Sequence, residues 1–241
     1  MNSFRKAAWL LAALAIFSAH AHIAHANGAS SSIANGDTKT GTVTGTGVDS
    51  YTFKATAGTA FVANLAETGT HDANFIPKLD LAAPGGGGMG NANALFTRLV
   101  QFSAAEGTWT IKVSRGDDKG LTGGSYALTL VQVPGAGNPT AMARGRDYSG
   151  SYSRSTVDVY TFTGVAGHTA TLTLKPTDQT GFAPEIAVYT PSGETAGGRQ
   201  CITGCDQDVA TDSAGTYTVL VWKHDANDVA GTYSLTVNDK N

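Results

Sequence analysis

The most reactive side chains in this sequence belong to two cysteines. Cys201 and Cys205 lie close together, but their spacing differs from the Cys-x-x-Cys motif of redox enzymes. No second pair of Cys or His residues accompanies them to complete a zinc site. We therefore predict a local disulfide that orders one loop, and such a bond requires an oxidising compartment.

Two acidic pairs could offer oxygen ligands to calcium. Asp206 and Asp208 follow the cysteine pair, and Asp117 and Asp118 lie in an earlier glycine-rich segment. Carboxylate oxygens are the ligands that Ca²⁺ prefers, yet neither pair has the spacing of an EF-hand loop. A calcium site at Asp206 and Asp208 and an ordinary solvated loop both stay open.

Histidines are the other candidates for catalysis or metal binding. One cluster lies in an N-terminal segment that we expect to be removed: His20, His22 and His25. Three more are scattered along the chain: His71, His168 and His224. The Gly-x-Ser-x-Gly, His-Glu-x-x-His and phosphate-binding glycine-loop motifs are absent. We predict no catalytic residue and no cofactor beyond calcium, although a Ser-His-Asp triad assembled only in space leaves a hydrolase as the alternative.

The beginning of the sequence has the pattern of an export signal. Arg5 and Lys6 precede an apolar run from Ala7 to Phe17, and Ala24-His25-Ala26 matches a signal-peptidase cleavage site. Ala19-His20-Ala21 is an alternative site. The apolar run is too short to span a bilayer, which takes about 20 residues. We predict a signal peptide over 1–26 and a mature protein without a membrane span, exported to the periplasm or the medium.

The composition limits the class of partner. The chain has 241 residues and a formal net charge of −3, whereas nucleic-acid binding calls for a basic surface. Charged residues make up only 15%, but hydrophobic residues make up 41%, enough to build a core. We therefore expect a folded protein that does not bind nucleic acid.

An internal repeat organises the mature chain. The first copy of the repeat contains Val48–Phe53, Gly107–Thr110 and Gly124–Tyr126, which recur in the same order as Val157–Phe162, Gly215–Thr218 and Gly231–Tyr233. Between the copies, Pro134–Pro139 is rich in residues that break helices and strands. We predict two homologous domains over 35–133 and 144–241, joined by a linker over 134–143.

Each copy has the period-two pattern of β-strands. Trp109, Ile111 and Val113 alternate with polar residues, and Leu172 and Leu174 do the same in the second copy. Glycine and proline turns separate these short segments. The pattern predicts an all-β protein of two tandem antiparallel β-sandwich domains, jelly-roll-like in form, with an up-and-down barrel as the alternative.

The order of the repeated motifs resembles the bacterial pre-peptidase C-terminal domain family. The first copy carries Asp49-Tyr51-Phe53, Ala57-Gly58, Leu79 to Pro84, Gly107-Thr108-Trp109 and Gly124-Tyr126-Leu128-Leu130. The second carries Asp158-Tyr160-Phe162, Ala166-Gly167, Ile186 to Gly193, Gly215-Thr216-Tyr217 and Gly231-Tyr233-Leu235-Val237. The resemblance implies jelly-roll-like sandwiches of the kind attached to secreted hydrolases, which act in secretion or substrate binding. No catalytic domain accompanies the two copies in this sequence.

Two features of the repeat point to particular residues. Asp49 and Asp158 open the same strand in both copies, and we expect each to accept hydrogen bonds from backbone N–H groups in a nearby turn. Leu220 and Trp222 lie on the face of a strand opposite the core, and Tyr189 shares that outward parity. An outward aromatic face is either a ligand-binding platform or a surface covered by the other domain or by a loop.

We therefore expect an exported, non-catalytic binding or accessory protein whose partner is an extracellular polymer, a surface or a secreted hydrolase. An assembly factor for a separately encoded secreted peptidase is a further alternative.

Overall fold

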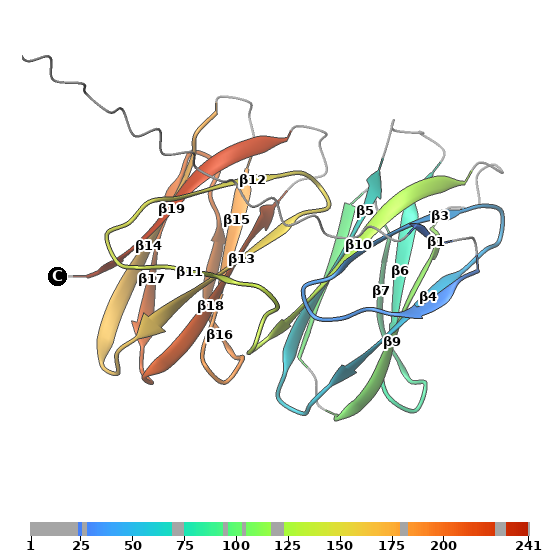
Figure 1. Ribbon diagram of the computed structural model, residues 1–241, viewed down its shortest axis with the longest axis horizontal. Helices are drawn as coiled ribbons and strands as arrows, with labels where there is room; N and C mark the ends of the chain where they lie inside the picture. Colours follow the sequence, from blue (N-terminus) through green and yellow to red (C-terminus); the bar gives the residue numbers. More distant parts are fainter. Residues whose placement is uncertain are drawn as a thin grey trace, which may run out of the picture.

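The computed structural model describes residues 24–25, 28–68, 75–93, 96–102, 105–116, 123–178, 183–224 and 230–240. These residues form strands and turns, without a helix, and the all-β prediction is confirmed. The strands build four sheets that make two β-sandwiches, which lie side by side (Figure 1). The predicted signal peptide lies almost entirely outside the described residues.

The first sandwich consists of two five-stranded sheets. Sheet A has the order β1-β3-β10-β5-β8, and sheet B has the order β2-β4-β9-β6-β7. Sheet A contains β1 (Ala24–His25), β3 (Thr38–Val43), β5 (Ala60–Thr68), β8 (Phe96–Phe102) and β10 (Gly124–Val133). Sheet B contains β2 (Ser30–Ser32), β4 (Asp49–Ala55), β6 (Pro77–Ala82), β7 (Gly88–Asn93) and β9 (Gly107–Arg115).

The second sandwich repeats this plan. Sheet C has the order β11-β13-β18-β15-β16, and sheet D has the order β12-β19-β14-β17. Sheet C contains β11 (Thr140–Ala141), β13 (Val157–Gly164), β15 (Pro184–Tyr189), β16 (Thr195–Gln200) and β18 (Gly215–Lys223). Sheet D contains β12 (Tyr148–Tyr152), β14 (His168–Pro176), β17 (Cys205–Thr211) and β19 (Gly231–Asp239).

The main strands follow the jelly-roll path predicted from the sequence. From β3 to β10 the chain passes between sheets A and B, and from β12 to β19 it passes between sheets D and C in the same sequence of moves. The antiparallel prediction needs one correction, because three short strands pair in parallel: β1 with β3, β2 with β4 and β11 with β13. Each precedes its sandwich and lies along an edge that the main strands leave open.

Each sandwich has its own hydrophobic core. Trp109, Phe53 and Phe61 pack as an aromatic cluster between sheets A and B. Tyr217 and Phe162 stack in the corresponding place between sheets C and D. Independent folding of the domains predicted over 35–133 and 144–241 stays a prediction.

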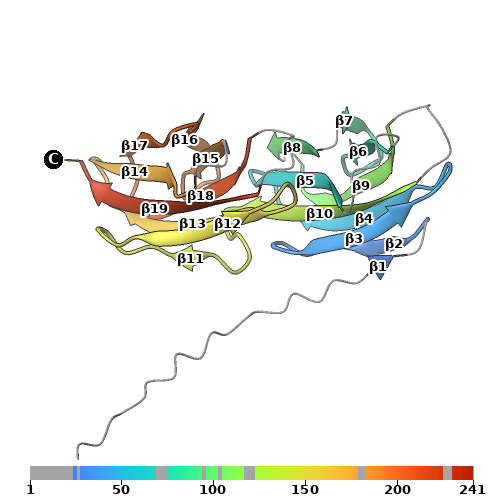
Figure 2. The ribbon, with the colours of Figure 1, turned by 90° about the horizontal axis from the view of Figure 1, so that it is seen from above.

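A third hydrophobic cluster joins the two sandwiches. It lies between sheet A and sheet C, so that the four sheets are stacked in the order B, A, C, D (Figures 1 and 2). The cluster consists of Ala60, Val62, Val131, Val133 and Ala136 from the first sandwich and its linker, and Tyr189, Leu220 and Trp222 from the second. Strand β5 is accordingly buried on both faces along nearly its whole length, whereas its counterpart β14 alternates between buried and accessible residues.

The first sandwich contributes apolar side chains to this contact from β5 and β10, and the corresponding strands of the second copy carry polar side chains at the same positions. Val62 and Val131 are opposite each other on β5 and β10, and the second copy has Thr171 and Asn238 in the corresponding pair on β14 and β19. The outer face of sheet D therefore stays polar. The apolar surface on sheet A thus has no counterpart on sheet D.

The described part of the chain contains no helix with the length and apolarity needed to cross a membrane.

Replacing Trp222 with alanine tests the contact between sheets A and C. Trp222 is only 2% exposed, and truncating a buried Trp costs about 3–5 kcal/mol of the free energy of unfolding. We expect a loss of that size in urea denaturation. Ile202→Ala is the control, because Ile202 is 64% exposed, and it should change stability by less than about 0.5 kcal/mol. Equal losses for both variants would contradict the contact.

Candidate functional site

The three residues predicted as a ligand-binding platform lie inside the contact between the sandwiches. Leu220, Trp222 and Tyr189 are 0%, 2% and 3% exposed. The platform alternative is therefore corrected, since the first sandwich covers this face and leaves no room for a ligand on it. The other alternative from the sequence, a contact between domains, describes their position.

A charged network borders these aromatic side chains. The guanidinium of Arg98, on β8, lies 4.0 Å from the centroid of the Trp222 ring. It also donates to the Glu185 carboxylate at 3.0 Å, and His224 approaches the same oxygen at 2.8 Å. Burial would raise the pKa of Glu185, but His224 and Arg98 outweigh it and hold that pKa below its usual range. The network stabilises Glu185 as a carboxylate and connects β8 to β15 across the contact.

A second polar group connects the sandwiches through the turn before β13. Arg154 lies 3.6 Å from the buried Glu67 carboxylate, and its carbonyl accepts from Asn64 at 3.2 Å. The hydroxyl of Thr129 donates to the carbonyl of Ser155 at 3.0 Å. Sheet A is thus hydrogen-bonded directly to the second sandwich, and the space beside this turn has fixed walls.

That space is a polar cleft of about 1040 Å³. Its walls come from β3 and β10 of the first sandwich, from the linker, and from β12, β13 and β19 of the second. Hydroxyl groups dominate the lining, among them those of Thr38, Thr129, Thr140, Ser149, Ser151 and Thr232. One carboxylate, that of Asp158, also lines it.

Asp158 belongs to a hydrogen-bonded group that both copies share. Tyr233 donates to Asp158 Oδ2 at 2.6 Å, and the Tyr160 hydroxyl lies 2.8 Å from that of Tyr233. Gly150 faces Tyr233 across β12 and β19, where a Cβ atom would lie 2.4 Å from the tyrosine hydroxyl. Glycine is required here because the ring crosses its backbone.

The first copy has the same hydrogen-bonded group, but there the carboxylate of Asp49 is fully buried. Tyr126 donates to Asp49 Oδ2 at 2.6 Å, and the hydroxyls of Tyr51 and Tyr126 are 2.6 Å apart. The other oxygen, Asp49 Oδ1, accepts from the N–H of Ala29 at 2.9 Å. The backbone donor predicted for Asp49 is therefore present, but it comes from the residue directly before β2 and not from a turn.

Asp158 differs from Asp49 in its environment. Within the part of the chain that the structure describes, Tyr233 is its one hydrogen-bond donor, so the predicted backbone donor is wrong for this residue. Burial raises the pKa of Asp158, and the bond from Tyr233 only partly offsets this. Burial next to this carboxylate also raises the pKa of Tyr233, which keeps the phenol protonated as a donor.

The predicted calcium ligands lie elsewhere, on the outer face of sheet D. Asp206 accepts from Thr173 at 2.6 Å, and Asp208 accepts from Thr171 at 2.7 Å and forms an ion pair with Lys240. Among the described residues, no group of three acids, histidines or cysteines could hold a metal ion. Calcium binding at Asp206 and Asp208 stays a prediction. Asp117, Asp118 and His71 lie outside the described residues, and His168 is exposed at the start of β14.

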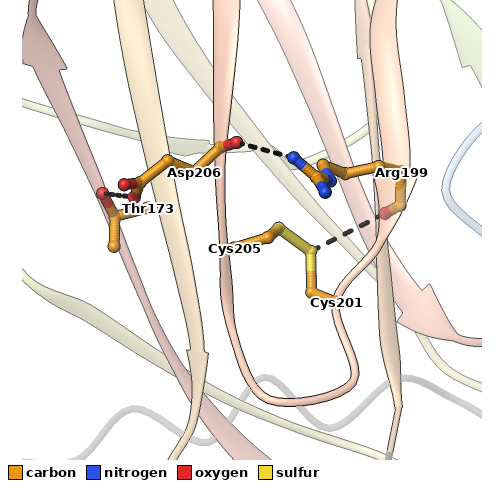
Figure 3. The surroundings of a disulfide bond; sticks show 5 residues. All are labelled: Thr173, Arg199, Cys201, Cys205 and Asp206. Atoms are coloured by element: carbon orange, nitrogen blue, oxygen red, sulfur yellow. Dashed lines mark hydrogen bonds between the residues drawn. A yellow bond between two sulfur atoms is a disulfide. The ribbon is translucent and has the colours of Figure 1, made fainter.

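The predicted disulfide between Cys201 and Cys205 is present (Figure 3), with Cα atoms 5.2 Å apart. Cys201 follows β16 at the edge of sheet C, and Cys205 begins β17 at the edge of sheet D. The Cys201 sulfur lies 3.7 Å from the Arg199 carbonyl, a contact and not a hydrogen bond, because a disulfide sulfur carries no proton. Arg199 also donates to the backbone carbonyl of Asp206 at 3.2 Å. The disulfide therefore holds together two sheets at their edge, beyond the single loop expected.

The cleft could not be recognised in the sequence because its lining residues are spread along the chain from Gly36 to Tyr233. Tyr160 and Tyr233 read as core positions of alternating strands, which they are. One signal was present: Asp-x-Tyr and Gly-x-Tyr motifs recur in both copies, and a duplicated carboxylate among buried tyrosines needs a partner. The sequence does not show that Asp49 has a backbone donor and Asp158 has none, because this depends on how the strands pair.

Comparisons with known proteins assign no family. No family model matches the chain, and no curated protein matches it. Among solved structures, it is similar to PliG, a periplasmic lysozyme inhibitor of g-type lysozyme from Aeromonas hydrophila. The TM-score is 0.37 at 16% identity, covering 45% of this chain and 99% of that one.

Two further structures are similar over different lengths. The pre-peptidase C-terminal domain of collagenase from Bacillus anthracis has a TM-score of 0.34 at 20% identity, covering 42% of this chain and 94% of that one. The CBM22-1–CBM22-2 tandem domain of Xyn10C from Paenibacillus barcinonensis has a TM-score of 0.22 at 8% identity, covering 79% and 82%. Likenesses this weak assign no activity to the chain.

Replacing Asp158 with asparagine should change how stability depends on pH. The folded state holds the Asp158 proton to a higher pH than the unfolded chain, whose pKa is near the ordinary value of 3.8. Between these two values the folded state binds more protons, so this carboxyl lowers stability as pH rises. Asparagine can still accept from Tyr233 but does not ionise. Urea denaturation should show the variant gaining stability relative to the wild type as the pH rises above the ordinary value of 3.8; a constant difference would contradict the raised pKa.

Removal of the disulfide should have a small effect on global stability. The loop that it closes is short, so the Cys201→Ser, Cys205→Ser double variant should lose about 2 kcal/mol of the free energy of unfolding or less. The intact mass of exported protein, with and without reductant, checks that the bond forms. Two free thiols in native material would refute the bond.

Proposed function

We propose that this chain is an exported, non-catalytic binding protein that holds its ligand in the cleft between its two sandwiches. The cleft itself carries the proposal. Its volume of about 1040 Å³ is large enough for part of a polymer or a protein segment, and both sandwiches and the linker contribute to it.

The contact between sheets A and C supports a preformed site. The hydrophobic cluster around Trp222 and the hydrogen bond from Thr129 to Ser155 lie next to the cleft. A site with fixed walls spends little free energy on ordering when its ligand binds. The hydroxyl groups of the lining can each both donate and accept hydrogen bonds, which suits a polar ligand and gives specificity.

Features of the sequence support export and a class of partner. The N-terminal pattern over 1–26 and the disulfide between Cys201 and Cys205 both support an oxidising compartment, periplasmic or extracellular. The resemblance to pre-peptidase C-terminal domains, in two tandem copies, favours an extracellular polymer or a secreted hydrolase as the partner.

A matched pair of tryptophan substitutions tests the role of the cleft. Ser151 and Thr42 occupy corresponding exposed positions, opposite Thr232 on β19 and Ser125 on β10. Ser151 lines the cleft, and the corresponding surface of the first sandwich is outside it. We expect Ser151→Trp to fill the cleft and Thr42→Trp to leave it open.

The measurement is retention of mature protein, residues 27–241, on cell-wall, collagen and polysaccharide matrices. A matrix that retains the wild type and Thr42→Trp but releases Ser151→Trp supports the proposal. Equal retention of both variants would place binding elsewhere. Turnover of protein, glycan or ester substrates by the purified protein would contradict the non-catalytic role.

A further inference from the structure

The strand edge beside the Asp–Tyr pair is completed in the first sandwich by a single extended residue. Ala29, directly before β2, donates its N–H to Asp49 Oδ1 at 2.9 Å. Its carbonyl accepts from the N–H of Ser50 on β4 at 2.7 Å. One residue therefore supplies both the donor for the carboxylate and the acceptor for the strand.

The second sandwich has the same strand but not the same residue. Thr140 on β11 lies opposite Tyr160, as Ser31 on β2 lies opposite Tyr51. Counting back along the chain, Pro139 stands in the place of Ser30. Asn138 stands in the place of Ala29.

The linker turns away at this point. Asn138 has a positive φ of 49°, and Gly137 is pressed against the first sandwich, where a Cβ atom would lie 2.3 Å from the carbonyl oxygen of Asn35. The chain is held there and does not continue along β13. Neither hydrogen bond made by Ala29 has a counterpart from Asn138 in the described residues.

The N–H of Val159 and the Oδ1 atom of Asp158, whose counterparts in the first sandwich bond to the backbone of Ala29, consequently face the cleft. Val159 lies opposite Leu220 on β18 in the register in which Ser50 lies opposite Lys112 on β9. Its N–H therefore points away from β18, as that of Ser50 points away from β9. Together with Asp158 Oδ1 it forms a donor and an acceptor spaced for one extended residue, and both residues line the cleft.

We infer that the cleft binds an extended polypeptide segment, one residue of which takes the place that Ala29 has in the first sandwich. Its N–H donates to Asp158 Oδ1, and its carbonyl accepts from the Val159 N–H. This inference rests on the proposed function and specifies its ligand. Addition of a short strand to an open sheet edge is a general mode of peptide recognition.

The geometry favours a peptide over an acetamido sugar. In an extended strand, the N–H and C=O of one residue point to the same side. The N–H and C=O of a single trans amide point in opposite directions, so an N-acetyl group cannot satisfy both partners. The bound peptide must leave the edge of β13 before it reaches Pro139, because from Thr140 onward β11 is already paired with that edge.

The probes are free peptides selected from a displayed library of random heptapeptides on immobilised mature protein, with chito- and cello-oligosaccharides in parallel. Each is titrated into ¹⁵N-labelled protein. We expect a selected peptide to move the Val159 amide signal. Asp158→Asn should weaken its binding about tenfold or more, as expected for a lost hydrogen bond to a charged group. Asp49→Asn is the matched control and should bind as the wild type does.

A second variant keeps the test decisive if Asp158→Asn does not fold. Val159→Pro removes the edge N–H, which β18 does not use, and proline is tolerated at such positions; it should weaken the same peptide. Peptides that ignore both substitutions, oligosaccharides that bind instead, or no binding by any probe would overturn the inference. Retention on a matrix that Ser151→Trp abolishes would, in those cases, leave the proposed function standing.

Discussion

Trp222 and Leu220 cannot stay in water without forgoing the free energy of burying them, roughly 1.5–3 kcal/mol for a side chain of this kind. Val62 and Val131 on the first sandwich cover them. The position of the two sandwiches follows from this contact, and so does the cleft beside it. Without it, the walls contributed by β10 and β13 would be joined by the polar contacts alone.

The sequence predicts well what depends on neighbours along the chain. Alternation such as that of Trp109, Ile111 and Val113 requires strands, and the order of repeated motifs requires two similar sandwiches. The disulfide follows from the proximity of Cys201 and Cys205. Each of these inferences needs only local geometry, and the all-β fold and the bond are both confirmed.

The site depends on pairings that the sequence does not display. The outward apolar face of β18 is visible in the sequence, but the surface that covers it is not. Val62 and Val131 become a patch only when β5 and β10 are paired. Tyr233, the hydrogen-bond donor to Asp158, is likewise 75 residues away in the sequence. The open edge of β13 appears only when the register of β11 is compared with that of β2.

Both copies therefore contain the same hydrogen-bonded Asp–Tyr group, but only the first copy adds a backbone residue that bonds to the carboxylate and to the strand edge. In the first, Ala29 closes the edge, and in the second, Asn138 and Pro139 leave it open toward the cleft. Amide hydrogen exchange of Ser50 and Val159 in the free protein tests this directly, because these N–H groups occupy the same place in the two sandwiches. The account predicts slow exchange at Ser50, whose N–H is bonded to Ala29, and much faster exchange at Val159. Equal protection of the two amides would show that the edge of β13 is closed and would contradict the account.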